Sequence, residues 1–537
     1  MARRILAFGL LLVLSFFAWG CGGSSSSAPS TPTGVSGTGT LYTFIGDTPI
    51  CDVLALRVNI TQMVLGVANS TNTVSVLSSL STVISVDLAS LRDTLVPLDI
   101  SSIDAGAYNR VSLGLSAGTM YLYDPTRNPP ITSMAANVST STPPLFTIDP
   151  QLNLASSGAS VLTMNFDLGH SIQVDSQGNV TGVVTPLANV GAPAPSTTTG
   201  FGYFDGVEGF LQTVQANSFT SGSSNFTGAV SVQSLPPTNG VGGGPTLTAN
   251  FTKNTAICAQ PVPPQLPVSN SVCTPQPLNT ILTNSYALLD GFVDSDGNLQ
   301  TNSITIGPEE DPTNQQIALI GPVLSVTKDS GGSVTGFMMF LRKTEPPPVV
   351  SAFSLDTAVD VSLPASAIYN TYPPAPAPGS TNPSVNFAAL PFGASAIAVG
   401  EDVVVHGVYT VPPTTPAPGV TPPVSVVASE VDLKLQSHEG AFASLLAVQT
   451  DDRTGVFTLS PCATLLQQGD APALPIYVVT SSSTSYVNTT GLTSLRPQPN
   501  LLVQGLLFYE PVSITLNGFT IPAGKLVMLA NRVTQLP

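Results

Sequence analysis

The sequence predicts an all-β protein in which an N-terminal sandwich is followed by three related small β-units. Long helices are disfavoured because 46 Gly and 49 Pro residues are spread along the chain and would interrupt them. Many segments rich in Val, Leu and Thr alternate between apolar and polar residues, as half-buried strands do. An internal repeat in residues 201–537 indicates that one strand order occurs three times.

The first 20 residues read MARRILAFGLLLVLSFFAWG, with two arginines before an uninterrupted apolar run. This arrangement predicts a secretory signal peptide over residues 1–20. Ala18, Trp19 and Gly20, directly before Cys21, resemble the lipobox of bacterial lipoproteins. The resemblance implies cleavage before Cys21 and lipidation of that cysteine. The alternative is an ordinary signal peptide followed by an incidental cysteine.

Residues 21–39 are rich in Gly, Ser and Pro and are expected to form a tether between the anchor and the folded part. Acyl chains on Cys21 would make a stable membrane anchor. In the lipoprotein family, an aspartate after the cysteine is associated with retention in the inner membrane, and this chain has Gly22 there. We therefore expect a lipid-anchored protein of the bacterial cell envelope, at the outer membrane or the cell surface.

The charge of the chain argues against one class of partner. The formal net charge is −16, and removal of Arg3 and Arg4 with the signal peptide changes it to −16 − 2 = −18. Because Lys and Arg are few and form no cluster, we expect no binding to nucleic acid.

Residues 40–190 are predicted to form the sandwich domain, followed by a linker over residues 191–200. The stretches TLYTFIGDTPICDVLALRVNITQMVL, AGAYNR and FDLGHSIQVDSQGNVTGVVTPL resemble an uncharacterised domain of bacterial exported lipoproteins. In that family an Asp-x-Pro turn, an Ala-Gly-x-Tyr motif and a final hairpin occur in this order. The resemblance implies an immunoglobulin- or prealbumin-like sandwich and brings no known activity.

Three repeats are predicted over residues 201–306, 315–435 and 436–537, with a linker over residues 307–314. Each repeat contains four matching strands, marked in turn by Gly209, Gly321 and Gly440; by Asn254, Asp356 and Ser483; by Gly291, Gly407 and Gly505; and by Ile304, Val431 and Val533. Glycine inside an apolar strand is typical of a barrel corner. The repeats resemble a second uncharacterised exported family, so we expect small OB-like barrels or sandwiches. Proline-rich inserts in the second repeat are expected to be exposed loops.

Five cysteines are present, and Cys258 and Cys273 flank a proline-rich loop. In an oxidising compartment these two are the expected disulfide pair, and closing a loop of about 15 residues would stabilise the fold by about 3 kcal/mol. Cys51 and Cys462 have no metal-like spacing, and we expect buried free thiols or, as the alternative, a second bridge.

Asp294 and Asp296 in VDSDGNLQT are the weak candidates for a metal site. An EF-hand loop that begins at Asp294 would need glycine at its sixth position and glutamate at its twelfth. Leu299 and Thr305 occupy these positions. Related stretches that begin at Val174 and Thr327 lack the second aspartate, so the pattern predicts a hairpin turn, and we expect no bound metal and no cofactor.

Three histidines were considered as metal ligands. His406 occupies a repeat position that holds Asp290 and Gln504 in the other copies, which predicts an outward, solvated side chain. His438 matches Val207 and Leu319 of the other copies, and we expect its side chain to be solvated in the same way. His170 shares the parity of apolar neighbours and is expected to point inward as a structural histidine, because no ligand partners can be identified.

Two further patterns were weighed as sites. Ser116 in GLSAG matches the nucleophile elbow of hydrolases by letter, but a strand-like segment follows it where the elbow requires a helix. Tyr369 and Tyr372 lie beside a proline-rich insert and are candidates for a binding loop, because exposed tyrosine is common at recognition surfaces. The alternative is that this loop is a spacer.

The leading functional hypothesis is a non-enzymatic lipoprotein that acts as a surface scaffold or binds an extracellular polymer, with glycans as one such polymer. Its partners would be the membrane, through the lipid, and extracellular polysaccharide or other envelope proteins. The alternative is a small-ligand or cation-binding module, and the second alternative is an enzyme without a recognisable motif.

Overall fold

The computed structural model describes eighteen stretches of the chain. These are residues 37–48, 52–77, 84–91, 96–138, 143–176, 179–195, 200–216, 226–234, 245–259, 274–275, 286–306, 316–345, 354–371, 392–410, 425–461, 464–467, 475–495 and 500–536. Strands dominate them, and helix is confined to the four-residue α2 (Leu168–Ser171) and short 3₁₀ turns. The all-β prediction is confirmed. Within these stretches, no helix has the length and apolar character needed to cross a membrane.

The N-terminal unit is a two-layer sandwich. One layer contains β5 (Val96–Asp104), β1 (Thr38–Thr48), β9 (Ala159–Asp167), β12 (Ala188–Gly191) and β8 (Leu145–Leu154), in that order. The other contains β2 (Val53–Val67), β3 (Thr73–Ser75), β4 (Ile84–Asp87), β6 (Gly106–Tyr123), β7 (Ile131–Val138), β10 (Ile172–Val174) and β11 (Val180–Val184). Strand β8 pairs with both β12 and β6 and so links the two layers.

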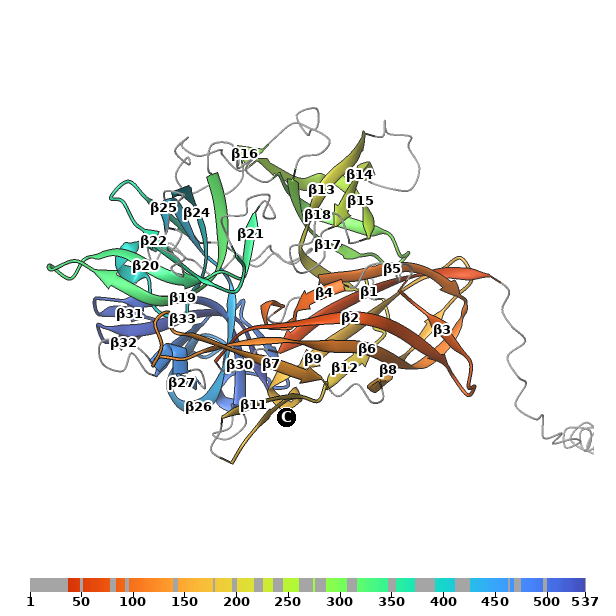
Figure 1. The fold of residues 1–537 in the computed structure, drawn as a ribbon, viewed down its shortest axis with the longest axis horizontal. Coiled ribbons are helices and arrows are strands. Elements are labelled where there is room, and N and C mark those ends of the chain that lie inside the picture. Colours follow the sequence, from red (N-terminus) through yellow and green to blue (C-terminus); the bar gives the residue numbers. More distant parts are fainter. Residues whose placement is uncertain are drawn as a thin grey trace, which may run out of the picture.

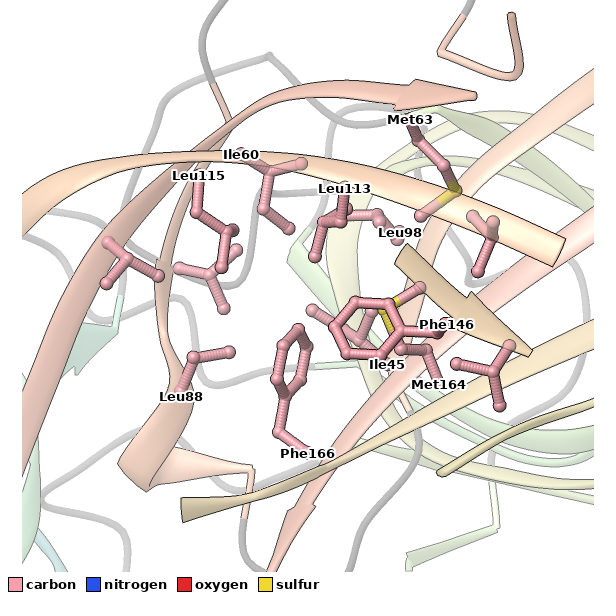
Figure 2. Close-up of a cluster of buried hydrophobic side chains, with 14 of the residues drawn as sticks. Ile45, Ile60, Met63, Leu88, Leu98, Leu113, Leu115, Phe146, Met164 and Phe166 are labelled. Carbon is pink, nitrogen blue, oxygen red and sulfur yellow. The ribbon is translucent and has the colours of Figure 1, made fainter. Parts of the chain in front are cut away.

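The core of the sandwich lies between these layers. Ile45 of β1 and Phe166 of β9 are buried on one side, and Ile60 of β2 and Leu113 of β6 are buried on the other (Figure 2). In the middle of β6, alternation places Val111, Leu113 and Leu115 in this core. The sandwich prediction is confirmed.

Three further units follow, and each is a barrel. The first barrel contains β13 (Gly202–Ala216), β14 (Phe226–Ser234), β15 (Thr246–Ala259), β16 (Thr274–Pro275), β17 (Tyr286–Val293) and β18 (Leu299–Ile306). The second contains β19 (Gln316–Lys328), β20 (Val334–Phe340), β21 (Lys343–Glu345), β22 (Ala358–Ser362), β23 (Ile368–Thr371), η5 (Ala394–Ala396), β24 (Asp402–Thr410) and β25 (Ser425–Leu433). The third contains β26 (Gln436–Val448), β27 (Gly455–Pro461), η6 (Thr464–Gln467), β28 (Ile476–Thr480), β29 (Ser485–Val487), η7 (Leu492–Ser494), β30 (Asn500–Glu510), β31 (Ile514–Leu516), β32 (Phe519–Ile521) and β33 (Lys525–Gln535).

The three barrels share one closed ring of strands. In the first barrel, β13 pairs with β14 and β17, β14 pairs with β15, β17 pairs with β18, and β15 runs parallel to β18. The second barrel repeats the ring with β19, β20, β22, β25 and β24, and the third with β26, β27, β28, β33 and β30. The predicted three OB-like barrels are therefore confirmed, because every ring closes with the same order and directions.

Six of the repeated glycines lie where strands approach most closely. Gly291, Gly407 and Gly505 each sit at a bulge between the fourth and fifth strands of their barrel. A β-carbon on any of them would overlap a backbone carbonyl oxygen of the neighbouring strand. Gly209, Gly321 and Gly440 on the first strands are crowded by carbonyl oxygens in the same way. The glycine pattern thus reflects barrel geometry.

The short polar strand lies where predicted in the first and third barrels. Thr255 Oγ1 accepts a hydrogen bond from the Thr252 N–H at 2.9 Å and donates to the Thr301 carbonyl at 2.8 Å. Thr484 repeats this pattern in the third barrel. In the second barrel the prediction is wrong, because the stretch at Asp356 precedes β22. The equivalent short strand there is β23, which pairs in parallel with β25 as β29 does with β33.

The four units pack against one another, with the sandwich beside the barrels (Figure 1). Phe44 of the sandwich stacks on Phe204 of the first barrel with ring centroids 6.0 Å apart. Phe392 of the second barrel meets Phe508 of the third at 6.3 Å. A cluster shared by the sandwich and the second and third barrels contains Leu54, Ala55, Tyr123, Leu324, Phe340 and Leu465.

Candidate functional site

The stretch that contains Asp294 and Asp296 is a hairpin turn between β17 and β18. Asp294 Oδ1 accepts hydrogen bonds from the backbone N–H groups of Asp296 at 3.0 Å and Asn298 at 2.8 Å. Its Oδ2 accepts one from the Gln300 side chain at 2.7 Å. Gly297 supplies the positive φ of 83° that the turn requires. The hairpin prediction is confirmed, and the Asp294 carboxylate is occupied by its own loop.

The aspartates of the two related stretches make similar hydrogen bonds to the backbone that follows them. Asp329 Oδ1 accepts hydrogen bonds from the Gly331 and Ser333 N–H groups, both at 2.8 Å. Asp175 Oδ1 accepts one from the Asn179 N–H at 2.9 Å. In the described part of the chain, no group of three or more His, Cys, Asp and Glu side chains could hold a metal ion.

The histidine predictions are wrong on burial. His170 lies in α2 with its side chain 79 % exposed, and its Nδ1 is 2.8 Å from Asp167 Oδ2. His406 is only 6 % exposed, with Nε2 3.3 Å from Asp432 Oδ2. His438 is also buried. Strand alternation gives the side of a strand but not what covers it, and His406 faces outward from its barrel yet is covered. His438 occupies the position that the core residues Val207 and Leu319 have in the first and second barrels.

The described tyrosine and serine candidates, Tyr369 and Ser116, lie within strands. Tyr369 lies in strand β23, partly buried, with its ring at 5.9 Å from that of Phe392 in an edge contact. The expectation of an exposed loop is therefore wrong for Tyr369, whose pKa is raised by burial. Tyr372 lies outside the described residues. Ser116 lies within β6, which continues as a strand to Tyr123 and forms no nucleophile elbow.

The cysteine candidates fall largely outside the described residues. Cys21, Cys51, Cys273 and Cys462 are not described, and Cys258 is placed only by the backbone of β15. The lipidation and disulfide assignments therefore stay predictions.

The densest set of buried charges lies where the sandwich meets the second barrel. Arg57 of β2 contacts Asp356 with Nε 2.5 Å from Oδ2, and its Nη2 donates to the Arg342 carbonyl at 2.9 Å. Arg342 in turn donates from Nε to the Leu54 carbonyl at 2.8 Å and from Nη1 to both Asp402 carboxylate oxygens, at 3.0 and 3.1 Å. We call Arg57, Arg342, Asp356 and Asp402 the charged junction.

Burial and ion pairing shift the pKa values of Asp356 and Arg57 in opposite directions. Burial raises the pKa of Asp356, and the hydrogen bond from Arg57 opposes that rise. Burial alone would lower the pKa of Arg57, but the hydrogen bond to Asp356 and nearby carboxylates outweigh it and raise that pKa. The Arg57–Asp356 pair crosses between the two units. The Arg342–Asp402 pair lies within the second barrel, and Arg342 reaches the sandwich through the Leu54 carbonyl.

The third barrel joins the same region through polar contacts. The Asp402 N–H donates to Gln436 Oε1 at 2.8 Å, and the Leu465 N–H donates to Asp52 Oδ1 of the sandwich at 3.1 Å. Glu401, next to Asp402 in the sequence, is fully buried. Burial raises its pKa well above the usual value, and the backbone amides of Ala398 and Tyr509 only partly oppose this.

This junction can hold units together but offers no recognisable reaction chemistry. Its arginines and carboxylates pair with one another, and the arginines also donate to the backbone carbonyls of Arg342 and Leu54. No sequence motif marks Arg57 or Arg342. The available signal was their rarity, because the chain has only 15 Lys and Arg residues and these two lie within or beside apolar strands.

The sandwich matches a known family model. Residues 38–186 match the model of a domain of unknown function, DUF4382. The match runs from β1 to β11, and it confirms the resemblance of the N-terminal block to an uncharacterised domain. No curated protein and no solved structure matches the chain.

Proposed function

We propose that this chain is a lipid-anchored protein of the bacterial cell envelope that acts as a surface scaffold and binds extracellular polymer without catalysing a reaction. The observation that supports it best is the charged junction, in which buried charges join separate β-units into a larger unit. Such a body can present a fixed surface away from the membrane. The N-terminal signal pattern and Cys21 support the anchor.

The anchor is tested by labelling and fractionation. The protein expressed in a Gram-negative host should incorporate labelled palmitate at Cys21 and sediment with membranes. Cys21→Ala should lose the label and appear in the soluble fraction. Membrane association of Cys21→Ala that resists high salt would contradict the proposed anchor.

Polymer binding is tested on the mature chain without its lipid. Residues 22–537 should co-sediment with purified cell-wall material or with an insoluble polysaccharide, in a saturable manner. Failure to bind any polymer would leave only the scaffold part of the proposal. Turnover of the polymer, detected as released reducing ends, would contradict the non-enzymatic part.

A further inference from the structure

The three barrels expose one equivalent face to three different environments. This face is the outer side of the second and third strands of each barrel. In OB-fold barrels this side binds oligonucleotides and oligosaccharides.

In the second barrel the sandwich covers the part of this face that β20 forms. Phe337 and Met339 of β20 are in the barrel core, so Met338 and Phe340, which alternate with them, point outward. Phe340 is fully buried, and its ring lies 5.9 Å from that of Tyr121 of the sandwich. This face therefore serves an internal interface.

In the third barrel the face is covered by the hairpin β31–β32 of the same barrel. Tyr477 of β28 stacks on Phe519 of the hairpin with centroids 6.2 Å apart. Asn517 at the hairpin tip donates from Nδ2 to the carbonyls of Gly455 at 3.2 Å and Thr480 at 2.7 Å. The hairpin thus occupies the position that a ligand would take.

In the first barrel this face is polar, and part of it is exposed. Ser231 and Gln233 of β14 and Thr246, Thr248 and Asn250 of β15 alternate with the core residues of these strands. Thr246 and Thr248 are exposed. Ser231 Oγ and Thr248 Oγ1 are 2.9 Å apart, and Thr246 Oγ1 donates to Gln233 Oε1 at 2.8 Å. We call these five residues the polar ladder.

The chemistry of the polar ladder indicates what it binds. All five side chains are uncharged and carry hydroxyl or amide groups, which can both donate and accept hydrogen bonds. Cross-strand hydrogen bonds fix four of them in place, which lowers the entropy cost of binding. A flat row of such groups complements the hydroxyls of an uncharged sugar chain, whereas an anionic polymer would meet no basic group within the ladder.

We propose that the polar ladder on β14 and β15 of the first barrel is a binding face for a neutral polysaccharide. This proposal rests on the proposed function and names both its polymer class and its site. The second and third barrels use their equivalent faces in contacts within the molecule, whereas among the described residues the first barrel leaves Thr246 and Thr248 of this face exposed.

The test is affinity electrophoresis of the mature chain in gels that contain soluble starch, dextran, laminarin or hydroxyethylcellulose. The variant Thr246→Ala/Thr248→Ala/Asn250→Ala removes three hydrogen-bonding groups, so the apparent affinity for the retarding polymer should fall about tenfold or more. The control Thr515→Ala/Thr520→Ala removes an exposed cross-strand Thr pair, 3.0 Å apart, from β31–β32 and should leave the affinity unchanged.

The outcomes separate this proposal from the broader one. Retardation that is unchanged in the triple variant would overturn the polar ladder while polymer binding by the chain stands. Binding to cell-wall material or polygalacturonate, with no retardation by any neutral polysaccharide, would overturn the assigned polymer class. Thr248→Val keeps a strand-forming residue and removes the hydroxyl alone, so weakened binding by this folded variant would support the ladder if the triple variant unfolds.

Discussion

At the scale of residues, Arg57 and Asp356 form the buried ion pair that crosses between the sandwich and the second barrel. Their side chains are 15 % and 8 % exposed. Arg57→Ala leaves the Asp356 carboxylate buried without its partner, so the free energy of unfolding should fall by about 3–5 kcal/mol. Denaturant titration measures the change.

A matched surface variant separates burial from charge in this prediction. Arg127 pairs with Asp124 at 3.0 Å, but its side chain is 59 % exposed. Arg127→Ala should therefore leave the unfolding midpoint unchanged, because exposed pairs contribute little. An equal loss of stability in the two variants would contradict the role given to the charged junction.

Glu401 predicts a dependence of stability on pH. Its folded pKa is raised by burial, so the unfolded chain ionises this group at a lower pH than the folded chain does. The stability associated with neutral Glu401 is fully present below the unfolded pKa and is lost as pH rises through the folded pKa. Glu401→Gln cannot ionise, so its melting temperature should exceed that of the parent at pH 8, and this advantage should shrink towards pH 4.

The control for this prediction is the acidic range. If Glu401→Gln lowers the melting temperature by the same amount at pH 4 and pH 8, the carboxyl group acts through packing alone. That result would contradict the proposed titration.

At the scale of elements, the repeated glycines were the most informative sequence signal. Gly407 lies at a bulge where a β-carbon would overlap the Val427 carbonyl. Gly407→Ala should therefore destabilise the protein by about 1–3 kcal/mol. Gly393 has extended backbone and open space around its β-carbon position, so Gly393→Ala should change stability by no more than about 0.5 kcal/mol. Thermal unfolding distinguishes the two, and equal effects would contradict the close-approach argument.

Elements are predictable from the sequence where the structural requirement is local to one strand or turn. The turn at Asp294 and the glycine bulges are local, so their residue types mark them directly. The short polar strand of the second barrel was misplaced because Ala367 stands there, without the threonine hydroxyl that marks this strand at Thr255 and Thr484. A residue that lacks the hydrogen-bonding group leaves no pattern to recognise.

At the scale of the whole molecule, the packing of the units could not be predicted from the sequence. Arg57 and Asp356 are 299 positions apart, and the sequence around either residue does not predict its partner. His406 was expected in solvent because alternation describes a strand in isolation. The polar ladder could not be predicted for the same reason, because the exposure of this face depends on how the units pack and is recognised by comparison with the other two barrels.

The interlocking of the sandwich with the barrels is the central claim, and one calorimetric comparison tests it. The melting temperature of the sandwich is measured in a fragment of residues 37–195 and in the mature chain. The fragment should melt at a lower temperature, because Phe44, Leu54 and Tyr123 lose their partners in the barrels. Equal melting temperatures for the sandwich in the fragment and in the whole chain would contradict the claim.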